Sequence, residues 1–172
     1  MRRAVLLCLF CIGAVGLADA PESPASVALA RLRTLAGNWQ GSLQWTGART
    51  GSGRMDATYY LTGNGSAIVE NLTVDGVPSM TSVYHLDGAD LRMTHYCGAQ
   101  NQPRLKARRI DLDRGILEFS FVDITNAPSP DAPHVHGLEI RFLDADHVTL
   151  TFLFTSAGKE SREHIDLRRA AR

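Results

Sequence analysis

The chain has 172 residues, of which 18 are Lys or Arg and 18 are Asp or Glu, so its formal net charge is zero at pH 7. A nucleic-acid-binding domain usually carries a surplus of basic residues, so this balance argues against a nucleic-acid partner. The length fits one domain with a sizeable hydrophobic core.

The chain begins with MRRAVLLCLFCIGAVGLADA, which has the organisation of a secretory signal peptide. Two arginines precede an apolar run that is too short for a membrane span, and small residues follow it. We place the cleavage site between Ala18 and Asp19, because a cut after Ala20 would leave Pro21 at the new terminus. We therefore expect a secreted or periplasmic protein with no membrane span. Its one remaining cysteine would be Cys97, so no intramolecular disulfide could form.

Residues 23–37, SPASVALARLRTLAG, predict one short helix. Ser23 can cap its N-terminus, Pro24 fits the first turn, and Gly37 can end it. Residues 19–37 therefore form an N-terminal segment that contains this helix and precedes the main domain.

The rest of the chain has the pattern of β-strands. Apolar and polar residues alternate in segments that recur about every ten residues, with turn residues between them. The predicted strands cover residues 38–46, 53–62, 66–73, 79–86, 91–97, 104–110, 115–123, 135–143, 147–155 and 162–169. This pattern predicts an all-β fold over residues 38–172, an antiparallel up-and-down β-barrel of about ten strands.

The predicted connections alternate between short and long. Tight turns fall at residues 63–65, 87–90, 111–115 and 144–147, and longer connections at 46–53, 75–79, 98–103, 126–133 and 156–161. Alternate connections lie at opposite ends of an up-and-down barrel, so we expect one plain end and one elaborated end. Binding residues usually lie on elaborated loops, so we expect the mouth of the barrel at that end.

Strand alternation predicts which side chains face the interior. The inward apolar residues include Tyr59, Tyr84, Met93, Phe119, Phe121, Ile140 and Phe152. Nearer the mouth, the same alternation predicts that five further side chains face the interior: His95, Cys97, Asp123, His134 and His136. We therefore expect an apolar cavity with imidazoles at its mouth.

The segment LAGNWQG at residues 35–41 resembles the Gly-x-Trp motif that opens the first strand of calycins, the lipocalin and fatty-acid-binding barrels. Three longer segments, YHLDGADLRMTHYCGAQNQPRLKA, EFSFVDITN and HVHGLEIRFLDADHVTL, resemble a group of uncharacterised bacterial secreted proteins with a lipocalin-like domain. The resemblance covers roughly residues 30–170. It implies a calycin-like barrel in which Trp39 lies across the closed end and packs on Arg169 of the last strand. It supplies no established activity or ligand.

His134 and His136 form an H-x-H pair, which would place both imidazoles on one strand face about 6.5 to 7 Å apart. With His95, and with Asp123 or Cys97, they could complete a site for zinc or ligate haem. Alternatively, these histidines line a polar mouth or hydrogen-bond to the backbone.

Cys97 lies two residues after His95 on the same strand. Side chains at this spacing point in parallel and seldom form the hydrogen bond that activates a thiolate, so we expect a buried, inert thiol. In the NQPR segment, Asn101, Gln102 and Arg104 either bind a ligand carboxylate at the rim or stabilise the loop.

Three functional hypotheses follow. The first is a binding module whose cavity accepts a small apolar or amphipathic molecule, and which is not an enzyme. Its basis is that a barrel of about ten strands is usually too wide for its own side chains to fill. The second is a metal- or haem-binding barrel with hydrolytic or redox activity at its mouth. The third is a filled core with an interaction surface only.

Overall fold

One α-helix, two short 3-10 turns and ten strands follow each other along residues 22–171, the part of the chain that the computed structural model describes. Helix α1 spans Pro24–Arg33. The strands are β1 (Gly37–Gly47), β2 (Gly51–Thr62), β3 (Ala67–Val74), β4 (Val77–Asp87), β5 (Asp90–Tyr96), β6 (Gln102–Asp111), β7 (Ile116–Thr125), β8 (His134–Phe142), β9 (His147–Ser156) and β10 (Lys159–Arg169). The predicted signal peptide and its cleavage site lie outside the described residues.

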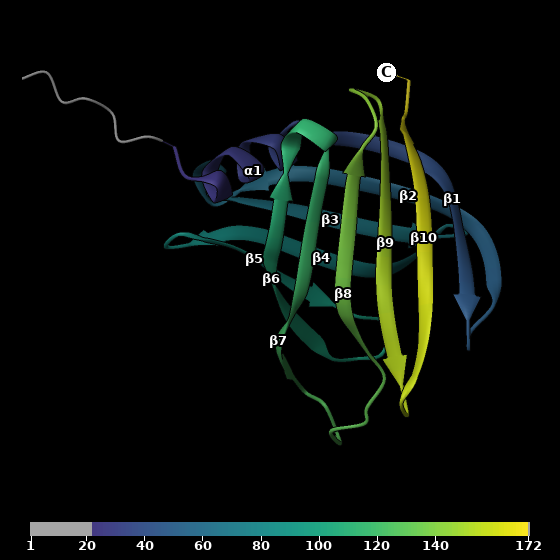
Figure 1. Ribbon diagram of the computed structural model, residues 1–172. Helices are drawn as coiled ribbons and strands as arrows, with labels where there is room; N and C mark the ends of the chain where they lie inside the picture. The colour runs from purple at the N-terminus through teal and green to yellow at the C-terminus, as the bar shows by residue number, and fades with distance from the viewer. Residues whose placement is uncertain (1–21, 172) are drawn as a thin grey trace, which may run out of the picture.

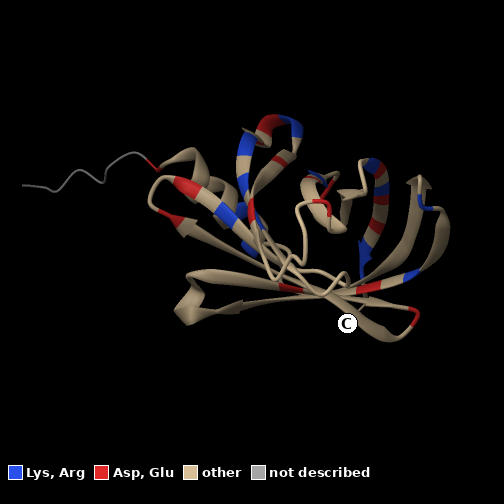
Figure 2. Cartoon of the chain, turned by 90° about the horizontal axis from the view of Figure 1, so that it is seen from below, with Lys and Arg blue, Asp and Glu red and all other residues tan. Residues whose placement is uncertain are grey.

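Every strand pairs antiparallel with its neighbours in the chain, and β1 also pairs with β10 (Figure 1). This last pairing closes the sheet, so the prediction of an up-and-down barrel of ten strands with one short N-terminal helix is confirmed. Figure 2 shows basic and acidic residues mixed along the same strands, as the balanced composition suggests. Among residues 22–171, no helix is both long enough and apolar enough to cross a membrane.

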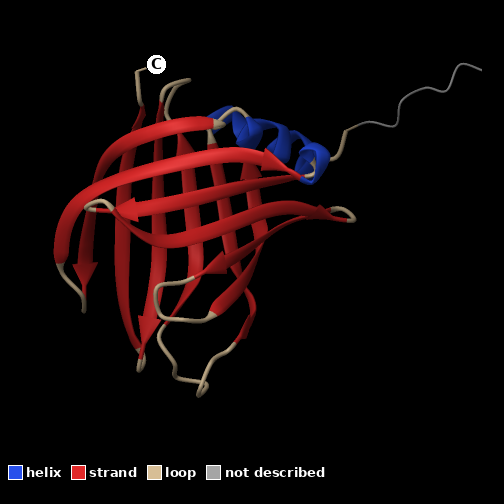
Figure 3. Cartoon of the chain, turned by 180° about the vertical axis from the view of Figure 1, so that it is seen from behind, coloured by secondary structure: helices blue, strands red, loops and turns tan. Residues whose placement is uncertain are grey.

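Helix α1 lies against one end of the barrel, opposite the long loop between β7 and β8 (Figure 3). The Ser23 hydroxyl caps the helix by accepting a hydrogen bond from the Ser26 N–H at 3.1 Å. The apolar face of α1 contributes four buried residues to the barrel core, namely Ala25, Ala28, Leu29 and Leu32. This spacing of three and four residues places them on one side of the helix, so α1 covers this end.

Trp39 and Arg169 complete the closed end. The Trp39 side chain is buried, and its indole N–H donates a hydrogen bond to the Leu35 carbonyl at 2.7 Å. Arg169, opposite Trp39 in the β1–β10 register, holds its guanidinium carbon 4.3 Å from the centre of the indole ring. The guanidinium also donates hydrogen bonds to the carbonyls of Thr34 and Ala36. The last strand is thereby tied to the segment that links the helix to β1.

At the opposite end, three of the five connections are shorter than predicted. The β3–β4 and β9–β10 connections are only Asp75–Gly76 and Ala157–Gly158, and the β1–β2 connection covers residues 48–50. Both residues of each dipeptide have positive φ, which is the backbone form that tight hairpin turns require. The prediction of long loops at 75–79 and 156–161 was therefore wrong. Residues 97–101 and 126–133 alone carry the elaboration at this end.

Candidate ligand-binding site

A cavity of about 470 Å³ opens at the end of the barrel away from α1. We call it the mouth cavity. Its apolar wall consists of Leu43, Trp45, Val74, Met80, Val135 and Phe154, and its main polar groups are Arg49, Ser79, Cys97 and Glu163. The volume lies within the usual range for small-molecule sites, and polar groups make up about half of the lining.

Glu163 is the most buried polar residue of the mouth cavity, with 3 % of its surface exposed. It lies on β10 between Trp45 of β1 and Phe152 of β9 in the strand register. Burial raises the pKa of its carboxyl to about 7, and this effect outweighs the opposite influences of Arg49 and the Trp45 indole. Glu163 therefore exchanges a proton near neutral pH inside a cavity of mixed polar and apolar lining.

Arg49 brings a cation to the aromatic wall. Its guanidinium carbon lies 4.0 Å from the centre of the Trp45 ring, and Trp45 in turn meets Phe154 edge to face at 5.7 Å. The Arg49 backbone N–H donates a hydrogen bond to the Ser161 hydroxyl at 2.9 Å, which anchors the turn that carries it. A cation over an indole face is attracted by the ring quadrupole.

Cys97 lies in the wall of the same cavity and is partly exposed. Its sulfur accepts a hydrogen bond from the Ala99 N–H at 3.4 Å. Burial raises the pKa of the thiol above its ordinary value, so the thiol stays protonated and weakly nucleophilic at neutral pH.

A buried polar cluster lies one layer deeper in the barrel. The Ser82 hydroxyl donates to one oxygen of Glu70 at 3.1 Å and lies 3.0 Å from Nδ1 of His95, while the Tyr84 hydroxyl donates to the other Glu70 oxygen at 3.0 Å. Burial raises the pKa of Glu70 to about 7. Since Ser82 and His95 lie two residues along their strands from Met80 and Cys97, this cluster forms a floor beneath the mouth cavity.

His95 is the one predicted mouth histidine whose side chain faces the interior. It is fully buried, its ring lies 5.1 Å from that of Phe152, and its Nε2 has no hydrogen-bond partner. Burial lowers its pKa to about 4, so the imidazole is neutral over most of the pH range in which proteins work.

His134 and His136 do not face the interior, which corrects the prediction from strand alternation. A β-bulge between Val135 and Gly137 places an extra residue in β8, and Val135 lies opposite Phe154 and joins the core. His134 lies opposite Thr155 and hydrogen-bonds through Nδ1 to the Ala132 carbonyl at 2.7 Å, while His136 Nε2 is 3.6 Å from the exposed Glu160 carboxylate.

The three histidines consequently do not meet. Within residues 22–171, no three His, Cys, Asp or Glu side chains are grouped closely enough to hold a metal ion. The prediction of a shared metal or haem site made of His95, His134 and His136 is therefore not supported by their positions.

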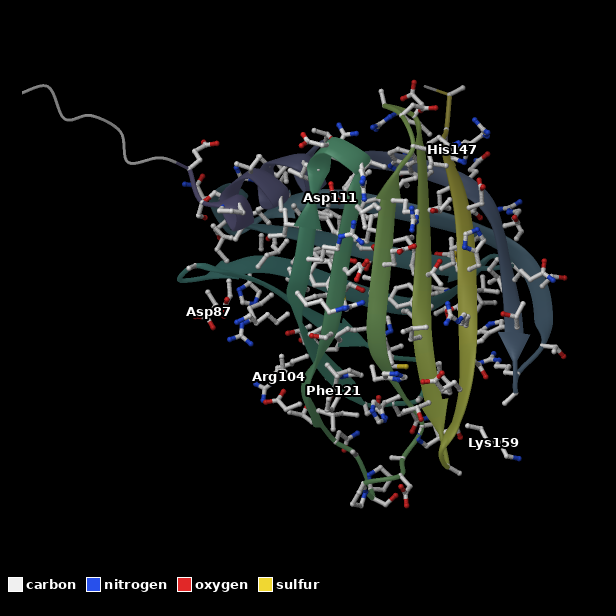
Figure 4. All side chains as sticks on the ribbon, viewed as in Figure 1. Asp87, Arg104, Asp111, Phe121, His147 and Lys159 are labelled. Atoms are coloured by element: carbon white, nitrogen blue, oxygen red, sulfur yellow. The ribbon has the colours of Figure 1, made fainter. Side chains whose placement is uncertain are left out.

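A second bulge has the same effect on Asp123. In the β6–β7 register Phe121 lies opposite the buried Leu105, and Asp123 lies opposite Arg104, so Val122 is the extra residue. Asp123 and Arg104 form a two-point ion pair at 2.5 and 2.7 Å on the exposed side of the barrel. Figure 4 shows Arg104 pointing away from the barrel, so neither residue reaches the mouth cavity.

Phe121 and the amides of the NQPR segment organise the loops. Phe121 is 37 % exposed and packs on His134, with ring centres 5.0 Å apart. The Asn101 amide donates to the Pro133 carbonyl at 2.8 Å, and the Gln102 carbonyl oxygen accepts from the Thr125 hydroxyl at 2.9 Å. Asn101 and Gln102 thus stabilise the loops around the mouth.

The other predicted cavity residues fill the barrel. Six of them are at most 2 % exposed and belong to the packed core: Tyr59, Tyr84, Met93, Phe119, Ile140 and Phe152. None of the six lines the mouth cavity. The hollow is therefore confined to the open end and is smaller than the whole interior that the sequence suggested.

Sequence reasoning missed Glu70, Ser82 and Glu163. A signal for the two acids was present, because Glu70 alternates with the apolar Ile68 and Leu72, and Glu163 with Ile165. A charged residue on the inward side of an apolar strand is rare enough to indicate a special role.

The fold and the cavity define a class of protein: a closed ten-stranded barrel that is packed at one end and hollow at the other. Solved structures that resemble this fold include the two described next. Rv2717c from M. tuberculosis has a TM-score of 0.57 and 16 % identity, with 84 % of this chain and 98 % of that chain covered. A protein of unknown function from the DUF3598 family of Nostoc punctiforme has a TM-score of 0.55 and 12 % identity, with 80 % of this chain covered.

This chain spans about half of the DUF3598 protein, since 48 % of that chain is covered. At such identities the likeness shows the fold alone. No family model matches the sequence, and no curated protein matches it.

Proposed function

We propose that this protein is a secreted or periplasmic, calycin-like barrel that binds a small apolar or amphipathic molecule and is not an enzyme. The observation that carries the proposal is the mouth cavity, about 470 Å³ in volume, in which apolar side chains form one part of the wall at the end away from α1. The N-terminal sequence pattern supports export, and the Trp39–Arg169 contact at the closed end supports the likeness to calycins.

The arrangement of the walls supports a binding role. Most of the cavity wall lies on paired strands of a closed sheet, which hold its shape, and two connections add Arg49, Thr50, Cys97, Gly98 and Ala99. Its one thiol is protonated at neutral pH, and the one buried imidazole, His95, lies in the floor and is hydrogen-bonded to Ser82. These groups suit a wall that contacts a ligand without reacting with it.

Displacement of the neutral fluorescent probe N-phenyl-1-naphthylamine tests this proposal. Ala99 lines the cavity, so Ala99→Phe should fill part of it and weaken probe binding at least about tenfold. The matched control is Ala145→Phe, which places the same ring on the exposed β8–β9 turn at the closed end. If the wild type binds no probe, or if both variants bind it equally well, the mouth cavity is not the binding site.

A further inference from the structure

The ionisable side chains of the mouth cavity indicate which ligands it favours. They are Arg49, Cys97 and Glu163, contributed by the β1–β2 turn, the β5–β6 connection and β10. Arg49 is exposed at the rim and Cys97 is uncharged, so the buried ionisable group is an acid. A cavity built for a carboxylate ligand would instead place its base inside.

The aromatic wall already holds a cation. The Arg49 guanidinium lies on the face of Trp45, and Trp45 is the direct cross-strand neighbour of Glu163. An indole face beside a buried carboxyl attracts positive charge from two directions. Arg49 therefore marks the position that the cationic group of a ligand would take.

Building on the function proposed above, we propose that the mouth cavity selects an amphipathic primary amine, whose ammonium group binds Glu163 beside Trp45 while its apolar body fills the cavity. The Arg49 guanidinium competes with this ammonium group for the face of Trp45. Anionic amphiphiles are disfavoured, because their head group would approach the Glu163 carboxylate. The exposed Arg49 compensates little, since exposed ion pairs are weak.

Three ligands with the same apolar chain test the proposal: dodecylamine, dodecanol and dodecanoate, each displacing N-phenyl-1-naphthylamine at pH 8 below its micelle concentration. Dodecylamine should bind at least about tenfold more tightly than dodecanoate, with dodecanol between them. Glu163→Gln should weaken dodecylamine binding about tenfold and leave dodecanol binding unchanged. Arg49→Gln should strengthen dodecylamine binding severalfold by removing the competing cation.

Glu160→Gln is the matched control, because it removes the same charge from the same strand at an exposed position outside the cavity. It should leave all three affinities unchanged. The affinity for dodecylamine should also fall as the pH is lowered from 8 to 6, because Glu163 then takes up a proton. Arg49 stays charged and Cys97 stays protonated over this range, so Glu163→Gln should abolish the pH dependence.

The outcomes separate the two proposals. If dodecanol binds but dodecanoate binds as tightly as dodecylamine or more tightly, the preference for amines is wrong and the binding function stands. If Glu160→Gln weakens dodecylamine binding as much as Glu163→Gln does, the effect is one of net charge and the proposal also fails. If none of the three ligands and no neutral probe binds, the binding function itself is wrong.

Discussion

The packed half and the hollow half of the barrel each bury one glutamate, Glu70 and Glu163, and in both burial raises the pKa to about 7. Their surroundings differ. Glu70 accepts hydrogen bonds from Ser82 and Tyr84 and lies in the core, whereas Glu163 lines a cavity with only the Trp45 indole and Arg49 to favour its charge. A raised pKa therefore identifies a buried acid but does not show its role. The accessibility of the carboxyl and the partners already present separate a structural acid from one that can bind a ligand.

The two tryptophans of β1 should show the largest difference between the halves. Trp39 packs against Tyr59 and Arg169 in the closed end, so Trp39→Ala should lower the free energy of unfolding by about 3 to 5 kcal/mol. Trp45 faces the mouth cavity, so Trp45→Ala should cost less, about 1 to 3 kcal/mol, while weakening probe binding strongly. Urea unfolding followed by far-UV circular dichroism measures both. Equal losses of stability would mean that the two ends are packed alike.

The buried glutamates should make the stability of the protein fall as the pH rises. A carboxyl whose pKa is raised on folding stabilises the fold fully below its unfolded pKa near 4.5, and this contribution is lost as the pH rises through its folded pKa of about 7. At about 1.4 kcal/mol per pKa unit, each glutamate accounts for up to roughly 3 kcal/mol between pH 4.5 and pH 8. Urea unfolding of the wild type at pH 5, 6, 7 and 8 should show this decline.

Glutamine at each position separates the two contributions. Glu163→Gln should leave stability unchanged at pH 5 and raise it at pH 8, because the cavity accepts a neutral amide without losing a hydrogen bond. Glu70→Gln should raise stability at pH 8 by less than Glu163→Gln does, because its amide nitrogen replaces a carboxylate oxygen that accepts a hydrogen bond from Ser82 or Tyr84. A wild type whose stability does not change between pH 5 and pH 8 would contradict both raised pKa values.

Strand alternation predicted correctly which side chains face the interior wherever a strand has no bulge. It placed Trp39 and His95 correctly, because β1 and β5 pair without an extra residue. It failed for Asp123 and for the histidines of β8, because each bulge adds one residue and reverses the side that side chains face between one side of the bulge and the other. The position of a bulge depends on how two strands pair, so the sequence of one strand does not reveal it.

The sequence also could not predict how far the cavity extends into the barrel. Alternation identifies which side chains point inward, but whether Tyr84 and Phe119 meet across the barrel depends on its width and the tilt of its strands. In the structure their rings lie 5.9 Å apart, so this level is filled. The hollow begins only in the half of the barrel nearer the mouth, where Phe154 of β9 and Glu163 of β10 line it.

The smallest effect is expected from the thiol in the cavity wall. Cys97→Ser changes the size of the side chain little and keeps an acceptor for the Ala99 N–H, so stability should change by less than about 1 kcal/mol and probe affinity by less than about twofold. Alkylating Cys97 with N-ethylmaleimide in a chain that starts at Asp19 should instead block probe binding, because the added group enters the cavity. Cys97→Ser treated with the same reagent is the control and should keep its binding. If Cys97→Ser loses probe binding without any alkylation, the thiol itself contacts the ligand, and the hollow half then recognises its ligand through sulfur as well as through Glu163.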